Sequence, residues 1–294
     1  MKLRRLPVAS LVCVCAFTCV WGGAPPGLAD TPDREHARAD DAVPLSAEAV
    51  LDRALEKRFD LDARASIAVT VTSRSGQTDR KQAELVSKRV NGLVQSLGRF
   101  TYPEELRGMA MLRLEKRGRM DDFFAYLPEF EKVRRLASPI RSDLFVGTDA
   151  TYEDIERRRA ADYQVELAEP ERAQGEEVWV VVTKPRYRES GYGRVDYLIA
   201  RADYAIIEQR HYRADADEPF KVIQAPREHM MAVADRIVPM RIRMDDHRHG
   251  THTEVEILRL QINPELPDSL FTTRALARQR RLPPFENEDD GDAE

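Results

Sequence analysis

The spacing of apolar residues changes once along the chain, from a helical period to an alternating one. Apolar residues recur every three or four positions over residues 50–59, and Ser46 stands before them as an N-cap residue. Further on, Ile67, Val69 and Val71 alternate with smaller or more polar neighbours, which is the pattern of a half-buried strand. The sequence therefore predicts an N-terminal helix followed by strands.

Alternating segments separated by turn residues continue to residue 262. Asn91-Gly92 is the strongest hairpin signal, because both residues tolerate the backbone of a tight two-residue turn. We expect further strands at residues 81–89, 93–102, 107–115, 123–127, 163–167, 177–183, 194–200, 204–212, 220–224, 230–234, 237–244 and 252–262. The predicted fold is mainly β, a half-open antiparallel β-barrel of about 11 strands whose curved sheet encloses an apolar interior.

Two later segments do not alternate. Residues 137–159 contain Pro139 and Gly147, with isolated apolar residues among charges. We interpret them as two short helical pieces joined by a loop, forming an inserted helical lid. Residues 266–280 have the spacing of another short helix.

The first 29 residues have the features of a secretory signal peptide. Lys2, Arg4 and Arg5 precede the apolar run 6–20, and Gly27-Leu28-Ala29 fits the small-x-small cleavage rule. The alternative is a membrane anchor, but the apolar run is shorter than the roughly 20 residues that a spanning helix needs. We expect cleavage after Ala29, a flexible tail at 30–44, a single domain at 45–282 and an acidic tail at 283–294.

Composition and charge exclude several classes of protein. The chain of 294 residues is 42% hydrophobic and 33% charged with a net charge of −5, which argues against disorder throughout and against a polytopic membrane protein. The acidic balance also argues against a nucleic-acid partner. All three cysteines, Cys13, Cys15 and Cys19, lie in the expected signal peptide, so we expect neither disulfides nor thiol chemistry in the mature chain.

Metal-ligating and catalytic patterns are weak. His247, His249 and His252, with Asp245 and Asp246, are the one metal-like cluster, but they straddle a turn and alternate between faces, so we expect a solvated hairpin and no metal. The sequence has no Gly-x-Ser-x-Gly nucleophile elbow. We therefore predict no catalytic residues and no cofactor, although strands far apart in the chain could still bring an acid–base pair together.

Two basic segments could bind a partner. One combines arginine with tyrosine and could hold an anionic lipid head group, or could be a sheet face with extended arginines: Arg186, Tyr187, Arg188, Tyr192 and Arg194. The other is Lys132–Arg135, which is either a solvated strand edge or a docking surface.

Several ordered motifs carry a family resemblance. They are Asp-Phe-Phe-Ala-Tyr-Leu-Pro at 122–128, Lys-Val-Arg-Arg-Leu at 132–136, Gly-Thr-Asp at 147–149, Tyr-Glu-Asp at 152–154 and Leu-Pro-Asp-Ser-Leu-Phe-Thr-Thr-Arg at 266–274. Over residues 65–278 the chain resembles the outer membrane lipoprotein-sorting proteins of the LolA-like family, relatives of the periplasmic lipoprotein localisation factor A carrier.

The resemblance implies a monomeric periplasmic carrier that holds lipid or lipoprotein acyl chains in an apolar cavity. An inner-membrane transporter and an outer-membrane acceptor are its implied partners. We expect the inward strand faces and the lid to line the cavity, through Ile67, Val69, Val71, Leu112, Leu114, Phe145, Tyr152, Met240 and Ile242. The alternatives are a filled scaffold that acts as an interaction module in an envelope transport complex, and an enzyme acting on envelope lipid or glycan.

Overall fold

The computed structural model describes residues 45–57, 62–136, 141–156, 158–233, 236–278 and 282–285. All of them belong to the compact unit Pro44–Glu294. The expected signal peptide, the tail at 30–44 and most of the acidic tail lie outside the described residues. Within those described ranges, no helix is long and apolar enough to cross a membrane.

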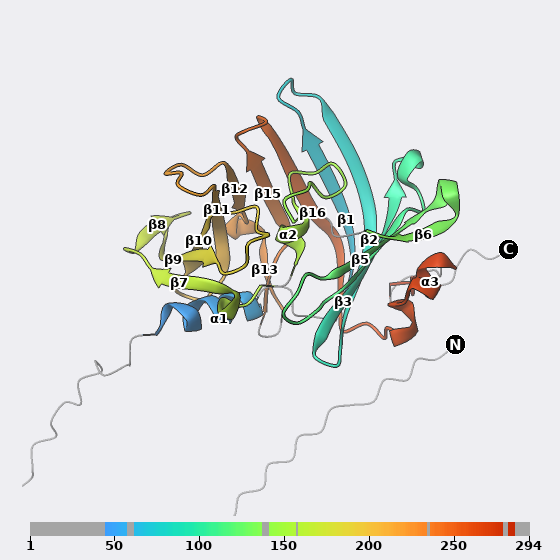
Figure 1. Ribbon diagram of the computed structural model, residues 1–294, viewed down its shortest axis with the longest axis horizontal. Helices are drawn as coiled ribbons and strands as arrows, with labels where there is room; N and C mark the ends of the chain where they lie inside the picture. Colours follow the sequence, from blue (N-terminus) through green and yellow to red (C-terminus); the bar gives the residue numbers. More distant parts are fainter. Residues whose placement is uncertain are drawn as a thin grey trace, which may run out of the picture. The chain divides into compact units, whose positions relative to one another are not determined.

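Strands are the main secondary structure of the described chain (Figure 1). The three α-helices are α1 (Ala47–Lys57), α2 (Tyr152–Ile155) and α3 (Thr273–Ala277). The strands are β1 (Ala63–Thr72), β2 (Thr78–Val90), β3 (Leu93–Tyr102), β4 (Ala110–Leu114), β5 (Asp122–Leu127), β6 (Lys132–Arg135), β7 (Tyr163–Leu167), β8 (Glu171–Ala173), β9 (Glu176–Pro185), β10 (Arg194–Ala200), β11 (Ile206–Tyr212), β12 (Lys221–Gln224), β13 (Met230–Val233), β14 (Arg236–Pro239), β15 (Arg241–Asp246) and β16 (Thr251–Ile262).

One antiparallel sheet of 14 strands dominates the fold. Its order is β6-β5-β4-β3-β2-β1-β16-β15-β12-β11-β10-β9-β7, and β8 pairs with β9. The edge strands β6 and β7 do not pair with each other, so the sheet is not closed. The prediction of a mainly β, half-open architecture is confirmed. The count exceeds the expected 11 because short strands such as β6 and β8, rich in charge, give no alternating signal.

The local predictions at the start of the domain are confirmed. The hydroxyl of Ser46 accepts a hydrogen bond from the backbone N–H of Ala49 at 3.2 Å, which caps α1. Asn91 and Gly92 join β2 to β3 with φ values of 52° and 76°, the left-handed backbone that a two-residue hairpin turn needs. These short-range signals worked because each depends only on its immediate neighbours.

Strand pairing defines two faces of the sheet, because directly opposed residues point the same way. One row of directly paired residues crosses seven strands: Val181, Tyr197, Gln209, Ile223, Met244, Thr253 and Val71. Helix α1 and residues 141–156 pack on the side of the sheet to which this row points, and we call that side the inner face. A second row marks the opposite side, which we call the outer face: Arg64, Val86, Leu97, Leu112 and Phe124.

The C-terminal segment covers part of the outer face. Leu266, Leu270, Phe271 and Leu276 are buried against a cluster that includes Leu112. This segment was expected to be one helix over 266–280, but the structure has a 3-10 turn at Asp268–Leu270 and only five residues in α3. Thr272 interrupts the helical run because it caps α3, its hydroxyl accepting from the N–H of Ala275.

Candidate functional site

A segment that we call the strap, residues 141–156 with 158 and 159, lies against the inner face. Of the two short helical pieces expected here, the second is present as α2, a single turn, and in place of the first the described residues from 141 onward form turns and loop. Thr151 begins α2 in a capping box, exchanging hydrogen bonds with Asp154. The aromatic ring of Tyr152 meets those of Phe123 and Phe145 edge-on, at centroid distances of 5.1 and 5.4 Å.

A buried ion pair fixes the middle of the strap. Lys221 of β12 is fully buried, and its ammonium lies 2.5 Å from the Asp154 carboxylate and 2.5 Å from the Tyr192 hydroxyl. Tyr192 also donates to the other carboxylate oxygen at 2.8 Å. Burial alone would raise the pKa of Asp154, but Lys221, His211 and Arg158 hold it well below its usual range. The carboxylate therefore stays ionised and paired.

Two further acidic side chains anchor the strap on either side of this pair. Glu153 is almost fully buried and accepts hydrogen bonds from the Tyr187 hydroxyl at 2.9 Å and the Ser190 hydroxyl at 2.6 Å. Asp149 accepts from Thr251 at 2.5 Å and from Thr253 at 2.6 Å, both on β16. In each case hydrogen bonds from protein groups replace those that water would make to the carboxylate, as burial of a charge requires.

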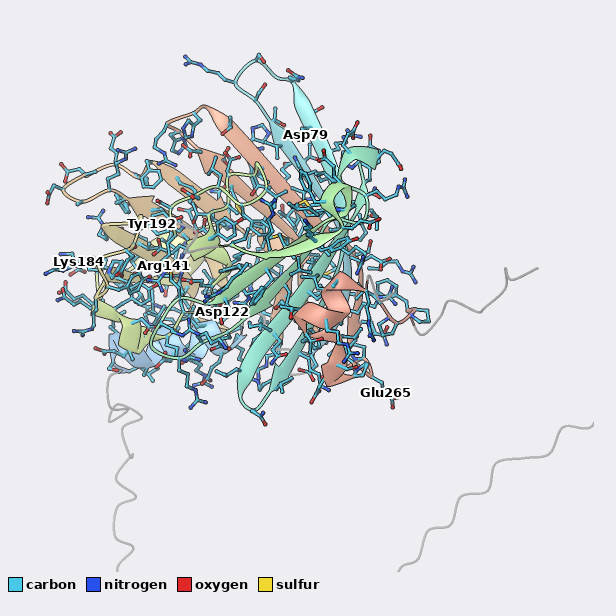
Figure 2. The ribbon with its side chains drawn as sticks, turned by 45° about the vertical axis from the view of Figure 1, so that its right-hand side comes forward. Asp79, Asp122, Arg141, Lys184, Tyr192 and Glu265 are labelled. Carbon is cyan, nitrogen blue, oxygen red and sulfur yellow. The ribbon has the colours of Figure 1, made fainter. Side chains whose placement is uncertain are left out.

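Cations of the strap complete the network. Arg158 donates to the Tyr197 hydroxyl at 2.8 Å, and Arg159 pairs with the buried Glu115. Arg141, labelled in Figure 2, lies 2.9 Å from Glu156, and its guanidinium stands over the ring of Tyr187, 4.1 Å from the ring centroid. Breaking a buried ion pair costs about 3–5 kcal/mol. The strap is therefore clamped to the inner face, in contrast to a lid held by modest contacts.

A pocket lies on the inner face at the end of the sheet that α1 covers. Its volume is about 420 Å³, including solvent at its open mouth. Helix α1, the separate β13–β14 hairpin and strands β11, β12 and β15 supply its walls. Nine of the eleven lining residues are apolar: Ala54, Ala205, Ile206, Ile223, Ala225, Met230, Ile237, Pro239 and Ile242. The space inside it that the centre of a water-sized sphere can occupy is only about 20 Å³, room for about one water molecule, so an acyl chain can enter only if the walls move apart.

The two polar residues of the pocket wall are Lys57 and Gln209. Gln209 is only 5% exposed, and its backbone is paired on both sides within the sheet. Within the described part of the chain, its side-chain carboxamide makes no hydrogen bond. The amide is not among the side-chain atoms that are both shut off from solvent and without a partner, and it lies on the pocket wall. A polar group of a ligand in the pocket could therefore bind it.

Polar contacts join the roof of this pocket, α1 and the β13–β14 hairpin, to its surroundings and to each other. The carboxylate of Asp52 on α1 accepts from the N–H of Ala160 at 2.9 Å, and Arg236 of β14 donates to the carbonyl of Glu56. Trp179, the one tryptophan outside the expected signal peptide, lies beside α1 with its ring 5.0 Å from that of Tyr204. Apolar packing also holds α1, because Val50, Leu51 and Ala54 are buried against the inner face.

The structure divides the predicted cavity residues between the two faces. Seven are on the inner side of the sheet, Ile67, Val69, Val71, Met240 and Ile242 from the sheet and Phe145 and Tyr152 from the strap. Ile242 is the one of them that lines the pocket. Leu112 and Leu114 do not join this set, because they pack under the C-terminal segment on the outer face. Three consecutive residues of β4 are buried, so its apolar pattern could not tell the faces apart.

The two other candidate sites from the sequence take ordinary structural roles. Nδ1 of His249 lies 3.1 Å from the buried Asp246 carboxylate, and the guanidinium of Arg248 lies 2.6 Å from the same carboxylate. Burial alone would raise the pKa of Asp246, but hydrogen bonds from Arg248 lower it to about 2. No group of three or more His, Cys, Asp or Glu residues that could hold a metal occurs among the residues that the structure describes. Tyr187 and Tyr192 of the basic aromatic segment are inside the strap network.

Sequence reasoning did not identify Gln209, nor the Asp154–Lys221 pair. One signal for Gln209 existed, because it is a polar residue at an inward position of a strand whose cross-strand neighbours, Tyr197 and Ile223, are apolar. The ion pair joins residues 67 positions apart, and no local pattern announces such a contact.

Comparisons with solved structures define the fold. A domain assigned as an outer membrane lipoprotein-sorting protein from Vibrio parahaemolyticus matches with a TM-score of 0.72 and 22% identity, covering 78% of this chain and 97% of that one. A DUF1329 family protein from Desulfovibrio piger gives 0.71 and 20%, covering 79% and 99%. A LolA superfamily protein from Nitrosomonas europaea gives 0.61 and 22%, covering 77% and 97%. The chain has the LolA-like fold, as the resemblance implied.

A family model described as "Uncharacterized protein" matches residues 92–278, and the chain belongs to that family. The matched region contains the strap and most of the pocket wall, whereas α1 precedes it. The comparison with curated proteins finds no match.

Proposed function

We propose that the protein is a periplasmic carrier that binds lipid or lipoprotein acyl chains and passes them toward the outer membrane. The observation that carries the proposal is the apolar pocket between α1, the β13–β14 hairpin and the inner face. The LolA-like fold supports it, since the solved structures with this fold include a domain assigned to lipoprotein sorting. A secretory signal peptide would bring the chain to the periplasm.

The energetics suit a ligand that must be held and then released. Each buried methylene contributes about 0.8 kcal/mol, so a chain that buries about eight of them gains roughly 6 kcal/mol. That free energy corresponds to a dissociation constant of tens of micromolar. We expect α1 and the hairpin to separate as the chain enters, while the clamped strap stays in place.

A second candidate function is a scaffold in an envelope transport complex. The strap and its polar network fill the central inner face, and this packing favours a protein whose surface, not its interior, is the working part. Under that alternative the pocket is an incidental packing gap and binds nothing.

Binding to the pocket variant Ile242→Asp separates the two functions. A carboxylate on the pocket wall should abolish uptake of a dodecanoyl chain, read from the emission of Trp179. Leu258→Asp is the matched control, because Leu258 is 48% exposed and outside the pocket. Uptake by the parent protein that is lost only in Ile242→Asp supports the carrier. Equal uptake by a folded Ile242→Asp protein, or none by the parent, contradicts it.

A further inference from the structure

The side chain of Gln209 is the one polar group that β11 presents to the pocket. In the pairing across the sheet it stands between Tyr197 and Ile223, whose side chains belong to apolar clusters. The hydroxyl of Tyr197 accepts a hydrogen bond from Arg158. The residue is 5% exposed, and its carboxamide makes no hydrogen bond with the described chain. The amide is not among the side-chain atoms that are both shut off from solvent and without a partner, and it lies on the pocket wall, so a polar group of a ligand in the pocket can reach it.

A second glutamine shows how this sheet normally satisfies the same side chain. Gln224 lies on the neighbouring strand β12 and faces the opposite side, opposed to Glu208 in the register. Its Nε2 donates to Oε2 of Glu208 at 2.9 Å. The two residues share a type, a sheet and adjacent strands. They differ in that Gln209 faces an apolar pocket and Gln224 faces a carboxylate.

We propose that the Gln209 carboxamide binds the carbonyl group of an acyl ligand inside the pocket. The amide N–H groups would donate to a carboxylic acid or ester oxygen, while the hydrocarbon chain lies against Ile223, Met230 and Ile242. This inference rests on the proposed function and deepens it, because it selects acyl compounds over plain hydrocarbons and other apolar molecules. Lys57 lines the same pocket, and its positive charge favours a carboxylate where the ligand is a free acid.

Three ligands of matched chain length test the assignment on the chain that lacks its expected signal peptide. Decanoic acid, methyl decanoate and decane are offered separately in equilibrium dialysis, with bound and free ligand measured by gas chromatography. We expect the acid and the ester to bind about tenfold more tightly than decane, the difference that one buried hydrogen bond supplies. Tighter binding of the acid points to free fatty acids as the source, and tighter binding of the ester points to glycerolipids.

The variant Gln209→Leu should lose this preference and bind all three ligands with the affinity that the parent shows for decane. Gln224→Leu should retain the preference of the parent. Without ligand, Gln209→Leu should raise the urea midpoint, since it places an apolar side chain where the amide bonds to no protein group, whereas Gln224→Leu should lower it, since it removes the bond to Glu208. If Gln209→Leu does not fold, Gln209→Met provides the same comparison.

The outcomes distinguish a failure of the Gln209 assignment from a failure of the proposed carrier function. If the parent binds decane as tightly as the ester, or if Gln209→Leu keeps the preference, the assignment of Gln209 is wrong while the carrier stands. If the parent binds none of the three ligands, the carrier proposal fails, and this inference fails with it.

Discussion

Separating Lys221 from Asp154 should release the strap, and the cost can be worked out from the structure. Lys221 is fully buried and Asp154 nearly so, with 2.5 Å between ammonium and carboxylate. Either Lys221→Met or Asp154→Asn leaves a buried charge without its main partner, which costs about 3–5 kcal/mol. For a chain of this size, each kcal/mol lowers the melting temperature by roughly 2–4 °C. Each single variant should therefore melt roughly 6–20 °C below the parent.

The double variant distinguishes an ion pair from simple loss of packing. Once both charges are gone, no unpaired charge remains, so the double variant should cost less than the sum of the single ones. Urea unfolding should give a coupling energy of about 2 kcal/mol or more. The exposed pair Arg107–Glu104, 2.6 Å apart, is the matched control and should couple by less than about 0.5 kcal/mol. Equal coupling in the two pairs would show that the buried pair does not hold the strap.

Three further perturbations have defined outcomes. The pKa of Asp154 in the folded state lies below its unfolded value of about 3.9. The contribution of Asp154 to stability is therefore present above that value and is lost as the pH falls through the folded pKa. As the pH is lowered from 6 to 3, the urea midpoint should fall less steeply in Asp154→Asn than in the parent. Leu112→Ala should lower the free energy of unfolding in urea by about 2–5 kcal/mol, since Leu112 is fully buried. Acyl binding by the folded protein should be unchanged, and a specific loss of binding would show that Leu112 lines the cavity. Gly92→Ala should cost about 1 kcal/mol because φ is +76° there, and an unchanged melting temperature would count against the tight turn.

The sequence predicted the features of this fold that depend on near neighbours. Ser46 with the apolar spacing after it predicted α1, and Asn91-Gly92 predicted the β2–β3 hairpin. Alternation predicted the long strands, because each has one face more buried than the other. The same rule could not orient β4, where Ala110, Met111 and Leu112 are all buried because the C-terminal segment covers the outer face and other parts of the chain cover the inner one.

The candidate site was harder to predict, because it is made of long-range contacts. The sequence predicted a lid because charged residues of the strap, including Asp149 and Asp154, suggest exposure to solvent. No local pattern shows that Thr253 will bind Asp149 or that Lys221 will pair with Asp154. The pocket takes residues from α1, β11, β12, β13, β14 and β15. Of the predicted cavity residues Ile242 reached it, and the ligand roles of the others stay predictions.

Native mass spectrometry of the protein purified from the periplasm tests the central claim most directly. The account predicts one acyl compound bound per chain, released on denaturation and identified by extraction, and absent from the Ile242→Asp protein prepared in the same way. A mass without bound ligand, unchanged after incubation with envelope lipids, would contradict the carrier and favour the scaffold.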